Sequence, residues 1–221
     1  VISIFPDDFK IQNINSEFEN QTFTGYNISI LNIGKTWQNT AIPAFIFQQF
    51  GHSGPRKSIG IDCGIHAREW ISPAICRLLI FELIQCFEQN PNCDGDFENL
   101  ANNFDWYIIP LLNWDGYDYT WKKNRNWRKN RSKHSNGCVG VDLNRNADVG
   151  WESDEKCTES YRGPAPFSEP EMEAWRTFFE LAANASRLMS YITVHNFGQR
   201  LLSPYAAPKR YQQRSHQTFF F

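Results

Sequence analysis

The sequence lacks several features that would place it in a simple class. No apolar run is long enough to cross a membrane, because the best one, between Ile71 and Phe87, contains Arg77 and Glu82. The net charge is only −2, so no overall field favours nucleic acid or acidic lipid. No internal repeat or linker divides the 221 residues, of which 41% are hydrophobic. We therefore expect one globular domain with a substantial core.

Closely spaced cysteine pairs are also missing. None of the six cysteines belongs to a Cys-x-x-Cys motif, so a thiolate zinc site or a thioredoxin-like redox motif is not expected. Asn-x-Ser/Thr sequons begin at Asn20, Asn27, Asn130 and Asn184. An even number of cysteines together with sequons favours an oxidising environment, and we expect a secreted glycoprotein. Free buried thiols and chance sequons are the alternative.

Strand patterns alternate with two clear helix patterns. We expect strands at residues 28–33, 41–50, 58–63, 106–112 and 187–195. One helix is expected to begin at Ser72 and Pro73 and to end at Asn90 and Pro91. Its inward face would contain Ile75, Leu78, Leu79 and Phe87. Strands that alternate with helices and are apolar on both faces predict an α/β fold with a mixed, largely parallel sheet flanked by helices.

A second helix is expected after the capping box formed by residues 168–171. Its inward residues would be Met172, Trp175, Phe178 and Phe179. The strand expected after this helix ends at His195, and the strand at 58–63 ends shortly before His66. Sites in open α/β sheets lie beyond the carboxyl ends of the strands. Both histidines are therefore candidates for a functional site.

His66 and Glu69 are three residues apart in a turn between a strand and a helix. An imidazole and a carboxylate at this spacing can both reach one zinc ion. His195 would be the third ligand, although a lone histidine at a strand end is more often a hydrogen-bonded core residue. Two histidines and one carboxylate leave a position open for water, which is typical of a catalytic zinc site. Asp142 could orient a ligand histidine, or could simply cap a loop.

The densely basic stretch at residues 121–133 is interrupted by Trp and Asn. Such a stretch is usually a solvated face or a nucleic-acid patch, but these interruptions indicate a folded loop that orients particular guanidinium groups. Asn144 and Arg145 form a second polar group that could bind a free carboxylate. An arginine near the metal could stabilise an oxyanion. These features together indicate a hydrolytic zinc site for a substrate that carries a carboxylate.

Four motifs in this order resemble the zinc metallocarboxypeptidases of the pancreatic A/B type. They are the turn with His66 and Glu69, the runs at residues 113–132 and 138–146, and the strand ending at His195. The similarity covers about residues 28–208. It implies a carboxypeptidase-like fold, one Zn²⁺ per chain, and hydrolysis of the C-terminal peptide bond of peptides and proteins.

The resemblance also assigns roles to individual residues. It implies zinc ligation by His66, Glu69 and His195, and polarisation of the scissile carbonyl by Arg128. Asn144 and Arg145 would hold the substrate's terminal carboxylate, and Arg68 would belong to an outer subsite. The implied disulfides are Cys138–Cys157 and Cys63–Cys76, the second as in the B-type branch. The pairing of Cys86 and Cys93 stays open.

The chain departs from the family pattern towards its end. No residue matches the family's general-base Glu, its mobile Tyr or the pocket floor, which would lie beyond Phe221. We therefore expect a C-terminally truncated chain with little activity. Phe197 stands where the family usually has Tyr. The expected organisation is a polar segment at 1–27, a partial peptidase domain at 28–210 and a tail unlike the family at 211–221.

Two other functions remain open from the sequence. A non-catalytic protein that binds zinc or peptide C-termini would keep the same ligand residues without turnover. A protein that binds a polyanion through the basic stretch is disfavoured because the chain is not basic overall. We expect peptide or protein C-termini as the partner, no nucleic acid, no membrane span and a monomer.

Overall fold

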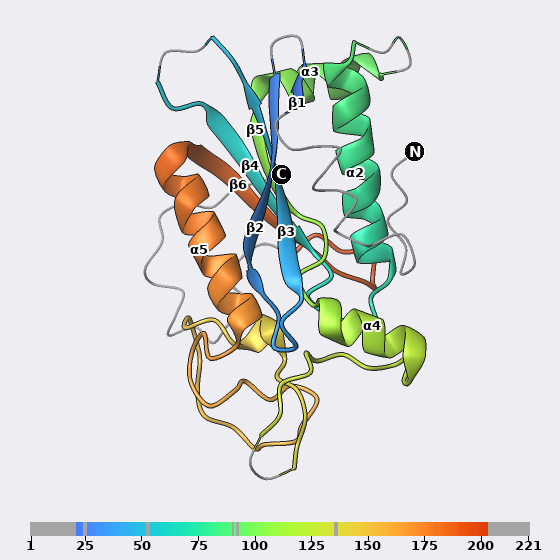
Figure 1. The fold of residues 1–221 in the computed structure, drawn as a ribbon, viewed down its shortest axis with the longest axis vertical. Coiled ribbons are helices and arrows are strands. Elements are labelled where there is room, and N and C mark those ends of the chain that lie inside the picture. The colour runs from blue at the N-terminus through green and yellow to red at the C-terminus, as the bar shows by residue number, and fades with distance from the viewer. Residues whose placement is uncertain are drawn as a thin grey trace.

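The computed structural model describes residues 21–23, 26–51, 54–89, 91, 93–134 and 137–202. These residues form a six-stranded sheet in the order β1-β2-β3-β5-β4-β6. The strands are β1 (Gln21–Phe23), β2 (Tyr26–Lys35), β3 (Ala41–Gln49), β4 (Lys57–Cys63), β5 (Asp105–Ile109) and β6 (Arg187–Val194). The helices are α2 (Ile71–Phe87), α3 (Gly95–Asn103), α4 (Trp114–Lys122) and α5 (Pro170–Ala185), with the short 3-10 helix η1 at Leu143–Arg145. Helix α5 lies on one face of the sheet and α2 on the other (Figure 1).

The expected mixed sheet flanked by helices is confirmed, with a smaller parallel share than the sequence indicated. Strand β4 is parallel to β5 and to β6, whereas β1–β2, β2–β3 and β3–β5 are antiparallel. Strands β2 and β3 are joined by the tight turn at residues 36–39, and so short a connection allows only antiparallel pairing. The sheet also begins before the boundary expected at residue 28. The tail expected at 211–221 and the sequon at Asn20 lie outside the described residues.

Each face of the sheet carries its own apolar core. Successive side chains of a strand point to opposite faces. Thus Phe45 and Phe47 pack in the core beneath α2, whereas Ala44 and Ile46 pack in the core beneath α5. On β4, Ile61 and Cys63 belong to the α2 core, so the intervening residue points to the α5 side. This alternation matters for the site, because it separates the environments of adjacent residues at the end of β4.

Helix α2 differs from its expected start. Trp70 holds the N-cap position and makes no side-chain capping bond. The Ser72 hydroxyl donates instead to the carbonyl oxygen of Val194 at 2.6 Å and accepts from the Gly64 N–H at 2.9 Å. The expected cap is therefore wrong, because this hydroxyl satisfies backbone groups at the ends of β6 and β4.

The face of α2 that was expected to be buried is also partly wrong. Ile75 and Leu78 are exposed, while Ile80 and Leu83 are fully buried. The helix is apolar on nearly every side, so its periodicity does not select one face. Among the described residues, no helix is both long and apolar enough to cross a membrane.

The expected capping box of α5 does not form. Glu169 is the N-cap and makes no side-chain capping bond, while the Ser168 hydroxyl donates to the Glu169 carboxylate. The expected inward residues are largely correct: Met172, Phe178 and Phe179 are buried. Trp175 is only partly buried, because its indole lies beside β6.

Glu171, in the first turn of α5, is a buried carboxylate that joins two separate loops. It accepts from the Trp37 N–H at 3.0 Å and from the Asn130 amide at 3.2 Å. Asn130 also donates to Glu169 at 2.8 Å and is fully buried, so its sequon is not a glycan site in this fold. Burial raises the pKa of Glu171 to about 7, against the opposing hydrogen bonds from Trp37 and Asn130.

The free energy of unfolding is expected to fall with rising pH because of Glu171. Its pKa is raised from an ordinary 4.5 to about 7, so between these values the unfolded chain ionises first and binds fewer protons. The loss amounts to at most about 3 kcal/mol. Urea unfolding at several pH values should show a steeper decline for the unchanged chain than for Glu171→Gln. Any loss of stability caused by the amide itself does not change with pH. If the free energy of unfolding declined equally with pH in the two chains, the result would contradict this prediction.

Candidate metal centre

A left-handed glycine begins the turn that carries His66 and Glu69. Gly64, immediately after β4, has φ +67°, and a Cβ at this position would collide with Leu111. The turn is closed by a hydrogen bond of 3.1 Å from the Glu69 N–H to the His66 carbonyl oxygen. A further bond of 3.0 Å joins the Ala67 N–H to the Arg128 carbonyl oxygen. Backbone geometry thus fixes the turn and holds the basic loop against it.

The parallel pairing of β4 and β6 brings His195 to the same place. Their register aligns Cys63 with Val194, so the carboxyl ends of both strands meet at one edge. One ligand atom from each of His66, Glu69 and His195 lies within 4.8 Å of the other two. The two Nδ1 atoms are 3.1 Å apart, and each lies close to a Glu69 oxygen, at 2.8 Å for His66 and 2.9 Å for His195. The structure therefore brings together the three residues that the sequence suggested.

The charges around this group favour an ionised Glu69. Burial raises the pKa of Glu69, but hydrogen bonds from His195, His66 and the Asn196 N–H outweigh it and hold the pKa at about 2. Burial lowers the pKa of His66, but hydrogen bonds to Asp142 and Glu69 outweigh it and raise the pKa. A negative carboxylate between two imidazoles is a donor set that suits Zn²⁺.

Asp142 fulfils both roles that the sequence left open. Its Oδ1 lies 3.2 Å from His66 Nε2 and also accepts from the Asn144 N–H at 3.1 Å, as the N-cap of η1. Its Oδ2 accepts from the Arg128 guanidinium, at 2.9 Å from Nη2. Burial raises the pKa of Asp142, but the hydrogen bond from His66 and the charge of Arg128 outweigh it and lower the pKa. One buried carboxylate thus orients both a histidine and an arginine.

Arg128 lies beside the three candidate ligands. Its Nη1 is 3.3 Å from His66 Nδ1 and 3.9 Å from Glu69 Oε1. The side chain is held by Asp142 and remains partly accessible. A guanidinium in this position can stabilise negative charge that develops on an oxygen next to the metal.

The basic stretch is a folded loop. Arg125 stacks over the Trp70 ring at 3.8 Å, and Arg131 stacks over Tyr119 at 3.6 Å. Lys129 is buried and donates to the Thr158 carbonyl oxygen at 2.9 Å. Arg68 is more open and contacts the carbonyl oxygen of Asn126 at 3.3 Å. Three of these cations thus hold the loop in place, and Arg128 is the cation of the stretch that lies beside the candidate ligands.

The candidate carboxylate binders lie on η1. Asn144 Nδ2 is 3.4 Å from His195 Nε2, so this amide borders the candidate ligand group. Arg145 is exposed, and its Nη1 donates to the Asn144 carbonyl oxygen at 2.8 Å. Phe197 is 98% exposed and makes no ring contact among the described residues. The structure thus places Asn144 beside His195, and Arg145 follows it on η1 as an exposed residue.

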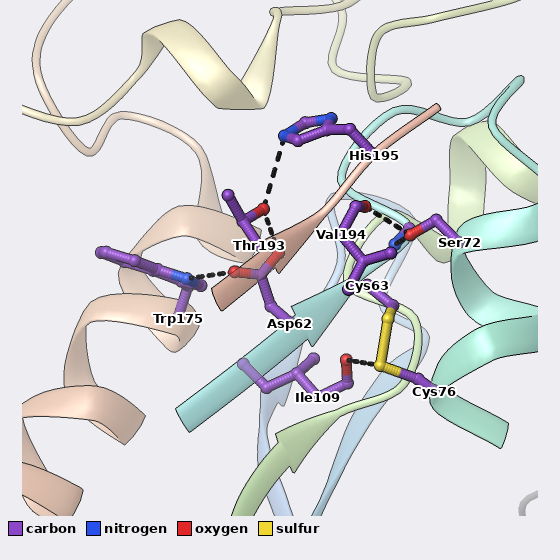
Figure 2. The surroundings of a disulfide bond; sticks show 10 residues. Asp62, Cys63, Ser72, Cys76, Ile109, Trp175, Thr193, Val194 and His195 are labelled. Carbon is purple, nitrogen blue, oxygen red and sulfur yellow. Dashed lines mark hydrogen bonds between the residues drawn. A yellow bond between two sulfur atoms is a disulfide. The ribbon is translucent and has the colours of Figure 1, made fainter. Parts of the chain in front are cut away.

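The six cysteines form three disulfides, each of which joins two cysteines that are consecutive along the chain. They join Cys63 to Cys76, Cys86 to Cys93, and Cys138 to Cys157. The first ties the end of β4 to α2 (Figure 2). The third closes the loop that carries Asp142.

Two site residues escaped the sequence analysis. Asp62 on β4 is fully buried and accepts from the Thr193 hydroxyl at 3.0 Å and from the Trp175 indole at 3.3 Å. Thr193 Oγ1 also lies 3.4 Å from His195 Nε2. A polar residue two positions before a candidate ligand in a strand was the available signal, because such residues share a face.

Comparison with known proteins agrees with this geometry. The model of the zinc carboxypeptidase family matches residues 21–219. Mast cell carboxypeptidase A of Rattus norvegicus is 41% identical over 183 residues, which cover 80% of this chain and 42% of that protein. Carboxypeptidase B2 of Homo sapiens is also 41% identical over 183 residues, covering 80% of this chain and 41% of that protein.

Solved structures show the same similarity. The crystal structure of thrombin-activatable fibrinolysis inhibitor superposes with a TM-score of 0.75 at 34% identity, over 90% of this chain and 48% of that chain. Carboxypeptidase A from Helicoverpa armigera gives a TM-score of 0.66 at 28% identity, over 85% of this chain and 44% of that chain. The chain belongs to the zinc carboxypeptidase family. It spans less than half the length of these relatives.

Proposed function

We propose that this protein is a zinc-dependent carboxypeptidase that removes the last residue of peptides and proteins. The observation that carries the proposal is the meeting of His66, Glu69 and His195 within 4.8 Å, beside the Arg128 guanidinium. Family membership supports the reaction type and disfavours the non-catalytic alternative.

The residues fit a zinc ion. Two imidazole nitrogens and a carboxylate converge, and Asp142 holds His66 by its other nitrogen. Zinc at such a site acts as a Lewis acid that polarises a carbonyl and activates water. Arg128, fixed by Asp142, would stabilise the negative charge that develops on the carbonyl oxygen.

Recognition of the chain end would come from η1 and Arg68. Asn144 and Arg145 present an amide and a guanidinium to solvent at the edge of the site. Such a pair can hold a carboxylate by charge-assisted hydrogen bonds, which confines cleavage to the terminal peptide bond. Arg68, which contacts the carbonyl oxygen of Asn126 in the basic stretch, would contact a residue further from the end of the substrate.

We propose that the protein is secreted and glycosylated. Three disulfides in 221 residues support an oxidising compartment. Of the sequons in the described residues, Asn184 is exposed near the end of α5, where a glycan has room.

Binding of a free C-terminus tests this function. Zinc-loaded protein is expected to bind a peptide with a free terminal carboxylate more tightly than the same peptide as its amide. Arg145→Ala should weaken the carboxylate peptide by about tenfold or more, because a charged hydrogen bond is lost. Arg176→Ala, on the exposed side of α5, is the control that removes a charge elsewhere. Calorimetric titration measures both.

Mass spectrometry of the peptides tests the reaction in the same preparation. Any release of residues should stop when a chelator removes the metal, and amidated peptides should stay intact. Equal binding of free and amidated peptides, or cleavage of the amidated ones, would contradict the proposed function.

A further inference from the structure

A short chain of buried polar groups leads from the interior to His195. Asp62 and Thr193 are register partners in the parallel pairing of β4 and β6, so their side chains lie side by side. Thr193 lies on the α5 side of β6, and His195, one residue beyond the end of the strand, brings its Nε2 to 3.4 Å from Thr193 Oγ1. Figure 2 shows the resulting line from Asp62 through Thr193 to the imidazole of His195.

The donor and acceptor atoms along this line determine where the hydroxyl hydrogen of Thr193 lies. Asp62 is fully buried, and its ionised carboxylate can only accept hydrogen bonds. Burial raises its pKa to about 6 against the bonds from Thr193 and Trp175. Above this pH it accepts from the Thr193 hydroxyl and shares the Trp175 indole N–H with the Tyr191 hydroxyl, which lies 2.8 Å from that nitrogen. The single hydroxyl hydrogen of Thr193 is then committed to Asp62. The oxygen of Thr193 can only accept from His195 Nε2.

This arrangement matches the environment of the other histidine. The Nε2 of His66 faces the acceptor-only carboxylate of Asp142 at 3.2 Å, so His66 also carries a hydrogen on Nε2. Both Nδ1 atoms lie against the Glu69 carboxylate, at 2.8 and 2.9 Å, so a metal bound among them would replace the hydrogens that they share with Glu69 and would meet both Nδ1 lone pairs. His66 and His195, which follow two different strands, thus each have an acceptor at Nε2. For His66 the acceptor is a carboxylate, and for His195 it is a hydroxyl whose own hydrogen is bonded to a carboxylate.

Asn144 is the competing partner of the same nitrogen. Its amide also lies 3.4 Å from His195 Nε2, but the side chain is exposed and can turn either its oxygen or its nitrogen towards the ring. It therefore accepts either tautomer. Thr193 accepts only one, because Asp62 fixes its hydrogen.

We propose that Asp62 and Thr193 act as positioning residues that hold His195 in the Nε2–H tautomer and so present its Nδ1 to the metal. The inference rests on the proposed function only in requiring that the site binds zinc. Removing such an outer partner typically weakens metal binding by 10–100-fold, through loss of orientation of the ligand.

The test compares three variants of the purified protein. Thr193→Val removes the hydroxyl with little change in shape, Thr193→Ser keeps it, and Thr36→Val is the matched control. Thr36 is buried and donates to the buried Asp115 at 2.7 Å, but no hydrogen bond of the described residues joins either to a candidate ligand. Zinc affinity, measured by competition with a chromophoric chelator, should fall about tenfold in Thr193→Val only. Thr193→Ser should retain the affinity of the unchanged chain, and Thr36→Val should lose stability alone.

A second readout does not depend on the variants folding. In zinc-loaded protein labelled with nitrogen-15 histidine, the His195 resonances, assigned by comparison with His195→Gln, should show a hydrogen on Nε2 and none on Nδ1. Zinc affinity of Thr193→Val equal to that of the unchanged chain would overturn the inference, as would a hydrogen on Nδ1 of His195. Neither readout involves a peptide, so equal binding of free and amidated peptides would count against the proposed function and leave this inference standing.

Discussion

His66→Gln is expected to lower zinc affinity by more than 100-fold. The imidazole of His66 is buried, faces Glu69 and is held by Asp142, so its loss removes an oriented ligand and leaves two. Loss of an outer partner alone costs about 10–100-fold, and loss of the ligand should exceed that. Metal content after dialysis against limiting zinc, measured by mass spectrometry, checks the stoichiometry, and chelator competition gives the affinity.

The control for His66→Gln is His134→Gln. His134 lies in the basic-loop region and packs edge-on against Tyr161 at 5.3 Å, away from the three candidate ligands. Its replacement should leave one zinc per chain. Both variants should keep the circular dichroism of the unchanged chain, which separates metal loss from unfolding. One zinc per chain retained by His66→Gln at unchanged affinity would rule out the proposed ligand set.

The sequence predicted the candidate site better than its surroundings. His66 and His195 each follow a strand, and parallel strands bring their carboxyl ends to one edge. This rule needs only the order of strand patterns along the chain. It does not need the contacts of any helix, which is why it succeeded although the expected inward face of α2 was partly wrong and its expected N-cap was wrong.

Helices α3 and α4 were not predicted, although each follows a residue whose side chain caps the helix. Helix α3 begins after Asp94, whose carboxylate accepts from the N–H groups of Asp96 and Phe97. Helix α4 begins after Asn113, whose side chain accepts from the Gly116 N–H. Both are ordinary capping residues. Their helices bury few apolar side chains, so periodicity gave little indication of them.

The partners of His195 could not be predicted for a different reason. Asp62 and Thr193 are distant in sequence, and only the register of β4 against β6 places them together. A slip of one residue would point Thr193 to the opposite face of the sheet. Ser72 shows the same limit, since its hydroxyl bonds Val194 across the sheet edge and does not cap its own helix. The sequence shows which residues are polar, whereas the register of the strands decides which groups they hydrogen-bond.

Asp142→Asn is expected to damage both metal binding and stability. The carboxylate is fully buried and bonds His66 and Arg128 at once. An amide presents one acceptor, so either the histidine loses its partner or the guanidinium does. Zinc affinity should fall by about 10–100-fold. The free energy of unfolding should fall by about 3 kcal/mol, because a buried ion pair is broken and Arg128 keeps some access to water.

Asp154→Asn gives the matched control for this double effect. Asp154 pairs with Arg162 at 3.8 Å with both side chains partly exposed, and such a pair contributes about 1 kcal/mol or less. Chelator competition and urea unfolding on the two variants separate the two consequences. If Asp142→Asn loses stability but binds zinc as tightly as the unchanged chain, Asp142 is a structural cap of η1 and an anchor for Arg128, and another group orients His66. If both fall together, one carboxylate couples the metal site to the arginine beside it, and Arg128→Ala in the Asp142→Asn background should then cost less stability than Arg128→Ala alone.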